Sequence, residues 1–182
     1  MNITSKIFFS AWLKSVHEPD MKPRLIENWR SPKKFTPLIK SSGDCVIRKI
    51  AYEVGLKCYS YDCYSVDAVL YQDSDLVPGI PAGSTWLRGL SVAFEHENFI
   101  NSGIYKEVSH LLILNADLRI LVAYPRGSIK DEELVEAHSI IRGSRHEKEI
   151  SDKESFLLIL GSKTDFQWQG FVYKQDDWKE IT

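Results

Sequence analysis

The spacing of apolar residues predicts a series of elements in the middle of the chain, beginning with an amphipathic helix. This helix follows Ser42 and ends at Gly55, a residue type that favours the left-handed conformation of a helix stop. Its apolar positions recur at helical spacing: Val46, Ile47, Ile50, Ala51 and Val54. Two short apolar segments, 57–62 and 64–71, predict strands, and segment 72–84, rich in Pro and Gly, predicts a loop.

A third strand is expected where an apolar segment ends in Glu95 and Glu97. Residues two apart in a strand point to the same side, so both carboxylates are expected on one face of a sheet. A helix capped by Ser102 is expected to run to about residue 115, and the apolar segment 118–124 predicts a strand buried on both faces. The predicted order is therefore helix, strand, strand, strand, helix, strand.

Segments outside this core extend the same domain. The apolar residues of segment 3–12 lie on one side of a helix, which indicates docking on the domain or on a second copy in a homodimer. A capping-box pattern, Ser128-x-x-Asp131, begins a helix that stops near Gly143. Two further strands are expected near the C-terminus, at 156–160 and 169–173. With 43% apolar residues, the chain is expected to form a single α/β domain, residues 1–182, with a central mixed sheet flanked by helices.

Acidic residues of the predicted strands are the main candidates for chemistry. Asp67 lies in the second predicted strand, and Glu95 and Glu97 lie in the third. A Glu at the end of a strand is usually a solvated residue, but neighbouring buried carboxylates repel and require a cation or a shared proton. Mg²⁺ and Mn²⁺ prefer oxygen ligands such as these. The three acids therefore predict a metal site between adjacent strands.

This order of elements, with Asp67 on the second strand and Glu95-x-Glu97 on the third, resembles the αβββαβ core of the PD-(D/E)xK nuclease superfamily, the restriction-endonuclease-like fold. The resemblance covers residues 42–125. It implies a nuclease that hydrolyses phosphodiester bonds of DNA or RNA, with Mg²⁺ or Mn²⁺ held by Asp67, Glu95 and Glu97. Here Glu97 stands where the family usually has Lys, and Val66 stands where it has Pro. Since the same change occurs in degenerate members, the alternative is a catalytically inactive binding or regulatory module.

The flanking helices offer further candidates for this site. Glu107 borders the apolar stripe of the second helix, and Glu53 has a similar position on the first. Some members of the nuclease superfamily recruit helix acids to the metal, so Glu107 is expected to point toward the three strand acids as a catalytic residue. For both helix acids, a solvated carboxylate on the outer helix face is the alternative. Lys106 offers a positive charge from the helix. His110 is expected on the outer side of its helix, and no two histidines have metal-ligand spacing, which argues against a zinc site.

The cysteines and the N-terminus bear on the cellular compartment. Three cysteines without a Cys-x-x-Cys spacing indicate reduced thiols and a cytoplasmic protein. The apolar segment 7–13 is too short to span a membrane and lacks a cleavage pattern, so no membrane association is expected.

The charge is distributed unevenly along the chain. Residues 1–60 contain 11 Lys or Arg against 5 Asp or Glu, whereas residues 61–182 contain 12 against 20. A loop-like basic cluster, residues 30–35, has Trp29 and Phe35 beside its positive charges, which predicts contact with phosphates supported by aromatic side chains. Nucleic acid is therefore the expected partner, and a solvated basic loop is the alternative.

Overall fold

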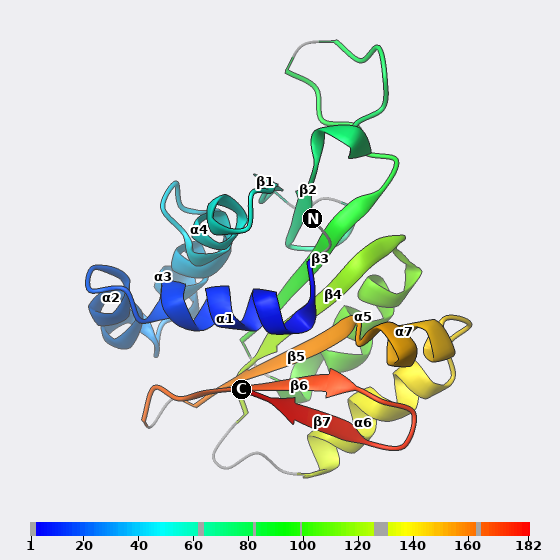
Figure 1. The fold of residues 1–182 in the computed structure, drawn as a ribbon. Coiled ribbons are helices and arrows are strands. Elements are labelled where there is room, and N and C mark those ends of the chain that lie inside the picture. The colour runs from blue at the N-terminus through cyan, green and yellow to red at the C-terminus, as the bar shows by residue number, and fades with distance from the viewer. Residues whose placement is uncertain (1–2, 62–63, 82, 99, 126–130, 163–164) are drawn as a thin grey trace.

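A seven-stranded mixed sheet organises the chain in the computed structural model, which describes residues 3–61, 64–81, 83–98, 100–125, 131–162 and 165–182. The strands lie side by side in sequence order (Figure 1): β1 (Lys57–Tyr59), β2 (Ala68–Tyr71), β3 (Leu90–Glu97), β4 (Ala116–Ala123), β5 (Phe156–Gly161), β6 (Trp168–Tyr173) and β7 (Trp178–Ile181). β3, β4 and β5 run parallel, and the outer strands pair antiparallel. The expected α/β fold with a central mixed sheet is confirmed.

Helices cover both faces of this sheet (Figure 1). One face carries α1 (Ser5–Val16), α2 (Met21–Asn28), α3 (Pro32–Thr36), the π-helical turn η1 (Pro37–Ser41) and α4 (Val46–Glu53). The other face carries α5 (Ile100–Ile113), α6 (Asp131–Arg142) and α7 (Glu147–Lys153). A short 3₁₀ turn, η2 (Asp73–Asp75), lies between β2 and β3. Within the described ranges, no helix has both the length and the apolar character needed to cross a membrane.

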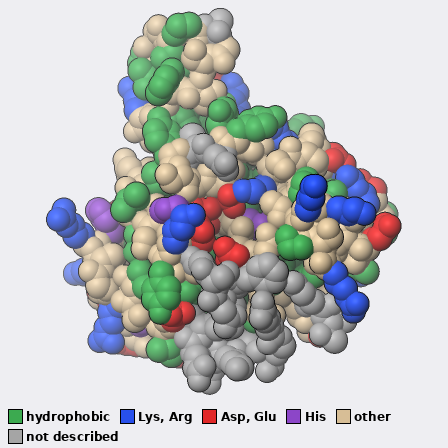
Figure 2. All heavy atoms as spheres, turned by 180° about the vertical axis from the view of Figure 1, so that it is seen from behind, with side chains coloured by type: hydrophobic (Ala, Val, Ile, Leu, Met, Phe, Trp, Pro, Cys, Tyr) green, Lys and Arg blue, Asp and Glu red, His purple; other side chains and the backbone are tan. Residues whose placement is uncertain are grey.

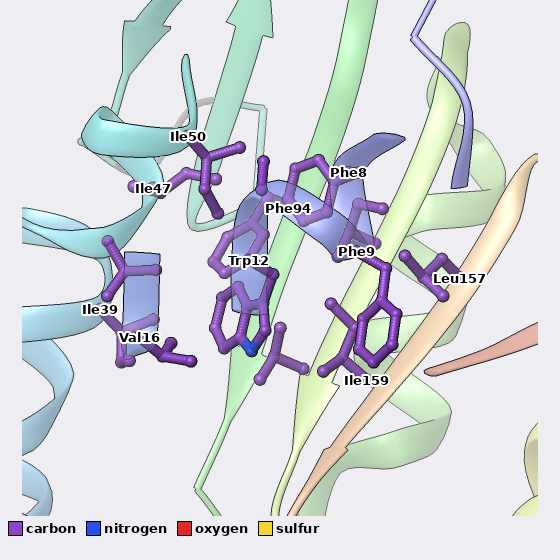
Figure 3. Packing of buried hydrophobic residues seen from close by; sticks show 14 of the residues in the cluster. Phe8, Phe9, Trp12, Val16, Ile39, Ile47, Ile50, Phe94, Leu157 and Ile159 are labelled. Atoms are coloured by element: carbon purple, nitrogen blue, oxygen red, sulfur yellow. The ribbon is translucent and has the colours of Figure 1, made fainter. Parts of the chain in front are cut away.

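Alternating residues of the central strands separate two hydrophobic cores. Phe94 of β3 faces α1, where its ring centroid lies 6.5 Å from that of Phe8 and 6.3 Å from that of Trp12 (Figure 3). Ala93, the preceding residue, belongs to the core on the opposite face together with Val108 of α5. This alternation is the expected period of a strand. The N-terminal helix therefore docks on the sheet of its own chain, one of the two arrangements that its apolar side predicted.

The predicted order of elements across residues 42–125 is observed as α4, β1, β2, β3, α5 and β4. α4 ends before Gly55, whose φ of +70° turns the chain out of the helix as expected. α5 begins at Ile100, two residues before the start predicted from Ser102. α6 ends one residue before Gly143, as expected, whereas Ser128 lies outside the described residues.

The second strand is shorter than predicted. Tyr64 and Ser65 have φ values of +53° and +68°, a left-handed conformation that an extended strand does not contain. β2 begins only at Ala68, and Asp67 lies in the bend before it. The prediction that placed Asp67 on the strand is therefore wrong, because the turn at residues 64 and 65 delays the start of the strand until Ala68.

Several short elements at the ends of the chain were not predicted. The basic segment expected as a loop contains α3, the polar segment 142–155 contains α7, and β7 extends the sheet beyond β6. Each has few buried residues; in α7, for example, Ile150 and Ser151 are the buried ones. So few apolar positions do not produce a recognisable periodicity in the sequence.

The cysteines in the described part of the chain are free thiols. Cys45 is buried and Cys58 is half-buried. Burial, with the neighbouring Cys45, raises the pKa of Cys58 to about 12, which disfavours the reactive thiolate. Cys63 lies outside the described residues.

Gly161→Ala tests the packing at the end of β5. A Cβ atom at Gly161 would lie 2.7 Å from atoms of both Trp168 and Tyr124. We expect the substitution to lower the free energy of unfolding by about 1–3 kcal/mol, because added atoms in a packed core force their neighbours to shift. Gly43→Ala is the control, since a Cβ atom there meets nothing within 4 Å. Urea unfolding measures both variants, and equal stabilities would contradict the expectation.

Candidate metal centre

An open pocket of about 570 Å³ lies between β3, α5 and the bend before β2. Its lining residues are Lys40, Ser65, Asp67, Glu95, His96, Glu97, Lys106, Glu107 and His110. Figure 2, a view from behind, shows acidic side chains gathered in the middle of one face with basic and histidine side chains near them. All four predicted catalytic residues, Asp67, Glu95, Glu97 and Glu107, therefore line one pocket.

Glu95 is the buried centre of this pocket. It follows Ala93 on the face of β3 that α5 covers, and its side chain is 3% exposed. Its Oε2 accepts a hydrogen bond from the backbone N–H of Asp67 at 3.2 Å, and its Oε1 lies 3.3 Å from Nδ1 of His110. Three separate segments of the chain thus meet at one carboxylate.

Asp67 is held from two sides. Its Oδ2 accepts a hydrogen bond from the backbone N–H of His96 at 2.9 Å, and its Oδ1 forms an ion pair with Nζ of Lys40 from η1. Both side chains of the ion pair are less than one fifth exposed, so water screens it weakly. Sequence reasoning missed Lys40, because only the fold brings a residue 27 positions away against Asp67.

α5 brings Glu107 and His110 to Glu95. The two helix residues lie one turn apart beside the buried Val108 and Leu111. Glu107 points toward Glu95, as expected, but the prediction that His110 faces outward is wrong, since its side chain is only 22% exposed and contacts Glu95. The signal in the sequence was the spacing of three residues between Glu107 and His110 at the edge of the apolar stripe.

A group that can hold a metal ion is formed by Glu95, Glu107 and His110, whose ligand atoms all lie within 4.8 Å of one another. With ligand distances of about 2 Å, one ion can contact all three after small side-chain rotations. This set joins one histidine to two acids from different elements, a combination that the spacing between histidines in the sequence does not indicate. Coordination by the predicted set, Asp67, Glu95 and Glu97, stays a prediction.

Burial and neighbouring acids change the proton affinity of Glu95. Loss of contact with water, a hydrogen bond with Glu107 and the negative charges of Asp67 and Glu107 raise the pKa of Glu95 from 4.5 to about 10. A cation beside this carboxylate would have the opposite effect. On the other face of β3, burial and the charge of Lys40 lower the pKa of His96 to about 3, so its imidazole is neutral.

The remaining helix candidates differ in their relation to the pocket. Lys106 lines it, but its side chain is 70% exposed and its Nζ lies 3.8 Å from Oε1 of Glu107. Glu53 lies elsewhere and pairs with Lys14 of α1 at 2.9 Å. Glu53 is an exposed helix carboxylate, the alternative considered for it, because α4 packs against α1 on the opposite face of the sheet.

The basic cluster is only partly as predicted. The basic residues of segment 30–34 are exposed, but Trp29 and Phe35 are buried with ring centroids 5.2 Å apart. Both rings belong to the hydrophobic core, so the expected aromatic support does not lie at the surface beside the basic residues. α3 is linked to the end of β3 by a hydrogen bond of 3.0 Å from Asn98 to Thr36, which keeps the basic segment near the pocket.

Comparisons with protein families, with curated proteins and with solved structures found no match to this chain. The interpretation of the pocket therefore depends on its own geometry and chemistry.

Glu95→Gln is expected to stabilise the metal-free protein by an amount that grows with pH. In the unfolded chain Glu95 loses its proton near its ordinary pKa of 4.5, whereas in the folded chain it keeps the proton at higher pH. Unfolding then releases a proton, so the parent loses stability as pH rises above about 5, and the Gln variant does not share this loss. We expect a gain of about 1–3 kcal/mol at pH 8 and little gain at pH 4.

Urea unfolding in the presence of EDTA at both pH values measures this difference. Glu149→Gln is the control, because this exposed acid pairs with Lys153 outside the pocket. A gain for Glu95→Gln that is independent of pH would contradict the assigned proton affinity.

Proposed function

We propose that this chain is a metal-dependent nuclease that hydrolyses phosphodiester bonds of DNA or RNA. The observation that carries the proposal is the buried carboxylate of Glu95, which lies in an open pocket with Asp67, Glu107 and His110. Burying a carboxylate among other acids is unfavourable unless a proton or a cation compensates it. Strongly perturbed acids in a pocket are typical of functional sites.

We further propose that residues 42–125 form a restriction-endonuclease-like core. The order of elements supports this, as does the pairing, in which β1, β2 and β3 are antiparallel and β3 and β4 are parallel. The two acids that the resemblance assigns to the metal, Asp67 and Glu95, are joined by a hydrogen bond from the backbone of one to the side chain of the other.

Four carboxylate side chains line the pocket, and carboxylate oxygens are ligands that suit divalent cations such as Mg²⁺ and Mn²⁺. When bound, such an ion offsets negative charge that develops on the phosphate. Asp67 and Glu95 would hold it by their oxygens. The superfamily usually has a Lys at the position of Glu97. Lys40, which pairs with Asp67, supplies a positive charge in its place. Glu97 itself lines the pocket, and in this proposal it is the general base toward an attacking water.

The distribution of positive charge supports nucleic acid as the partner. The exposed basic residues of segment 30–34 lie on α3 and directly before it, and η1, which follows α3, carries Lys40 into the pocket. Positive charge therefore extends from the surface to the candidate centre. Phosphates flanking a scissile bond are bound by such side chains without regard to base sequence.

The presence of Glu97 supports one alternative, a protein that binds without cleavage. Because the resembled family usually has Lys at this position, the chain can instead be a nuclease-fold module that binds nucleic acid or a protein without cleavage. Cleavage assays separate the two functions.

Asp67→Asn and Glu95→Gln are expected to abolish nuclease activity and leave the protein folded. Each change removes a ligand charge while keeping the shape of the side chain. We expect the rate of cleavage of DNA or RNA with Mg²⁺ or Mn²⁺ to fall by about 100-fold or more. Asp73→Asn is the control, because this exposed acid pairs with Lys57 away from the pocket and should leave the rate unchanged.

Thermal melts with and without Mn²⁺ accompany these assays, since an ion that binds only the folded state raises the melting temperature. A parent chain that cleaves neither DNA nor RNA with either ion would reject the catalytic proposal. Binding of nucleic acid without cleavage would support the inactive module.

Lys40→Gln tests whether this lysine replaces the one missing from β3. We expect cleavage to slow by about 10-fold or more, because the positive charge at Asp67 is lost. Lys106→Gln is the matched control from α5, and its exposed side chain predicts a change of less than about 3-fold. If instead Lys106→Gln alone slows cleavage, the helix lysine has the role assigned to Lys40.

A further inference from the structure

We propose that Glu95, Glu107 and His110 form a metal site that prefers Mn²⁺ to Mg²⁺, with the imidazole of His110 as the ligand that determines the preference. This set extends from β3 to α5 and differs from the three strand acids predicted from the sequence. The site lies in the pocket of the proposed nuclease. The role of the ion in catalysis rests on that proposed function, whereas the preference for Mn²⁺ does not.

The three donor atoms come from two elements that pack on each other. Nδ1 of His110 lies 3.3 Å from Oε1 of Glu95 and 3.7 Å from Oε2 of Glu107. All three ligand atoms lie within 4.8 Å of one another. Ligands about 2.1 Å from one ion lie about 3–4.2 Å apart, so the observed group needs only small rotations to coordinate it.

The helix that carries two of the ligands is fixed to the sheet. Arg119 of β4 is buried, and its guanidinium donates hydrogen bonds of 2.9–3.0 Å to the backbone carbonyls of Leu111, Leu114 and Ala116. These bonds hold the end of α5 against the strand next to β3. Ligands on rigid elements bind an ion without a large cost of ordering.

The imidazole nitrogen determines which ion fits best. Mg²⁺ prefers oxygen ligands in a near-ideal octahedron and retains several waters. Mn²⁺ also binds carboxylates well, but as a transition-metal ion it accepts an imidazole nitrogen more readily than Mg²⁺ does, at the weak end of a series in which affinity increases toward Co²⁺. Within the group of Glu95, Glu107 and His110, the histidine provides the nitrogen donor, so its removal should abolish the preference.

Calorimetric titration of the full chain with MnCl₂ and with MgCl₂ tests the proposal. We expect the parent to bind Mn²⁺ about 10-fold or more tightly than Mg²⁺. His110→Gln should weaken Mn²⁺ binding by about 10-fold or more and Mg²⁺ binding by less than about 3-fold. His146→Gln is the matched control, because this histidine is 57% exposed outside the pocket, and it should keep the preference of the parent. A preference that survives in His110→Gln overturns the proposal.

Electron spin echo spectroscopy of bound Mn²⁺ gives a second measurement. It is made on the parent chain, so it tests the proposal even if His110→Gln does not fold. Nitrogen coupling from a directly bound imidazole is expected in the parent and in His146→Gln. A parent without nitrogen coupling, or with equal affinity for both ions, overturns the proposal. Neither measurement uses nucleic acid, so the two proposals can fail separately. A chain that prefers Mn²⁺ to Mg²⁺ but cleaves no nucleic acid supports this metal site and rejects only the nuclease function.

Discussion

The burial of Glu95 between β3 and α5 is the constraint on which the rest of the candidate centre depends. β3 lies in the parallel part of the sheet, where both faces are covered, so a side chain directed toward α5 loses contact with water. A carboxyl group at such a position either keeps its proton or is stabilised by hydrogen-bond donors and cations close to it. The fold brings the backbone N–H of Asp67, the imidazole of His110 and the carboxyl group of Glu107 to this oxygen pair.

The connection from β3 through α5 to β4 explains how these partners arrive. Because β3 and β4 are parallel, the chain must return along the sheet, and α5 makes that return on the face to which Glu95 points. Val108 and Leu111 fix the rotation of α5 by their burial, and this rotation turns Glu107 and His110 toward the strand. The same apolar packing that stabilises the domain therefore arranges the polar pocket.

The other face of the sheet contributes through the N-terminal region. α1 packs on the sheet through Phe8 and Trp12, and α2, α3 and η1 follow it along this face. This path ends with Lys40 in ion contact with Asp67, so the segment before residue 42 completes the pocket and does more than cover the core. The buried rings of Trp29 and Phe35 hold the basic segment in place instead of contacting a ligand.

The sequence by itself determined the order of the elements from α4 to β4 and the shared face of Glu95 and Glu97, because strand and helix periods depend on residues a few positions apart. The pocket itself depended on tertiary structure. The left-handed turn before β2 directs Asp67, packing of α5 turns His110 inward, and η1 delivers Lys40. Each of these placements requires contact between segments that are distant along the chain. The local spacing of apolar residues does not predict such contacts.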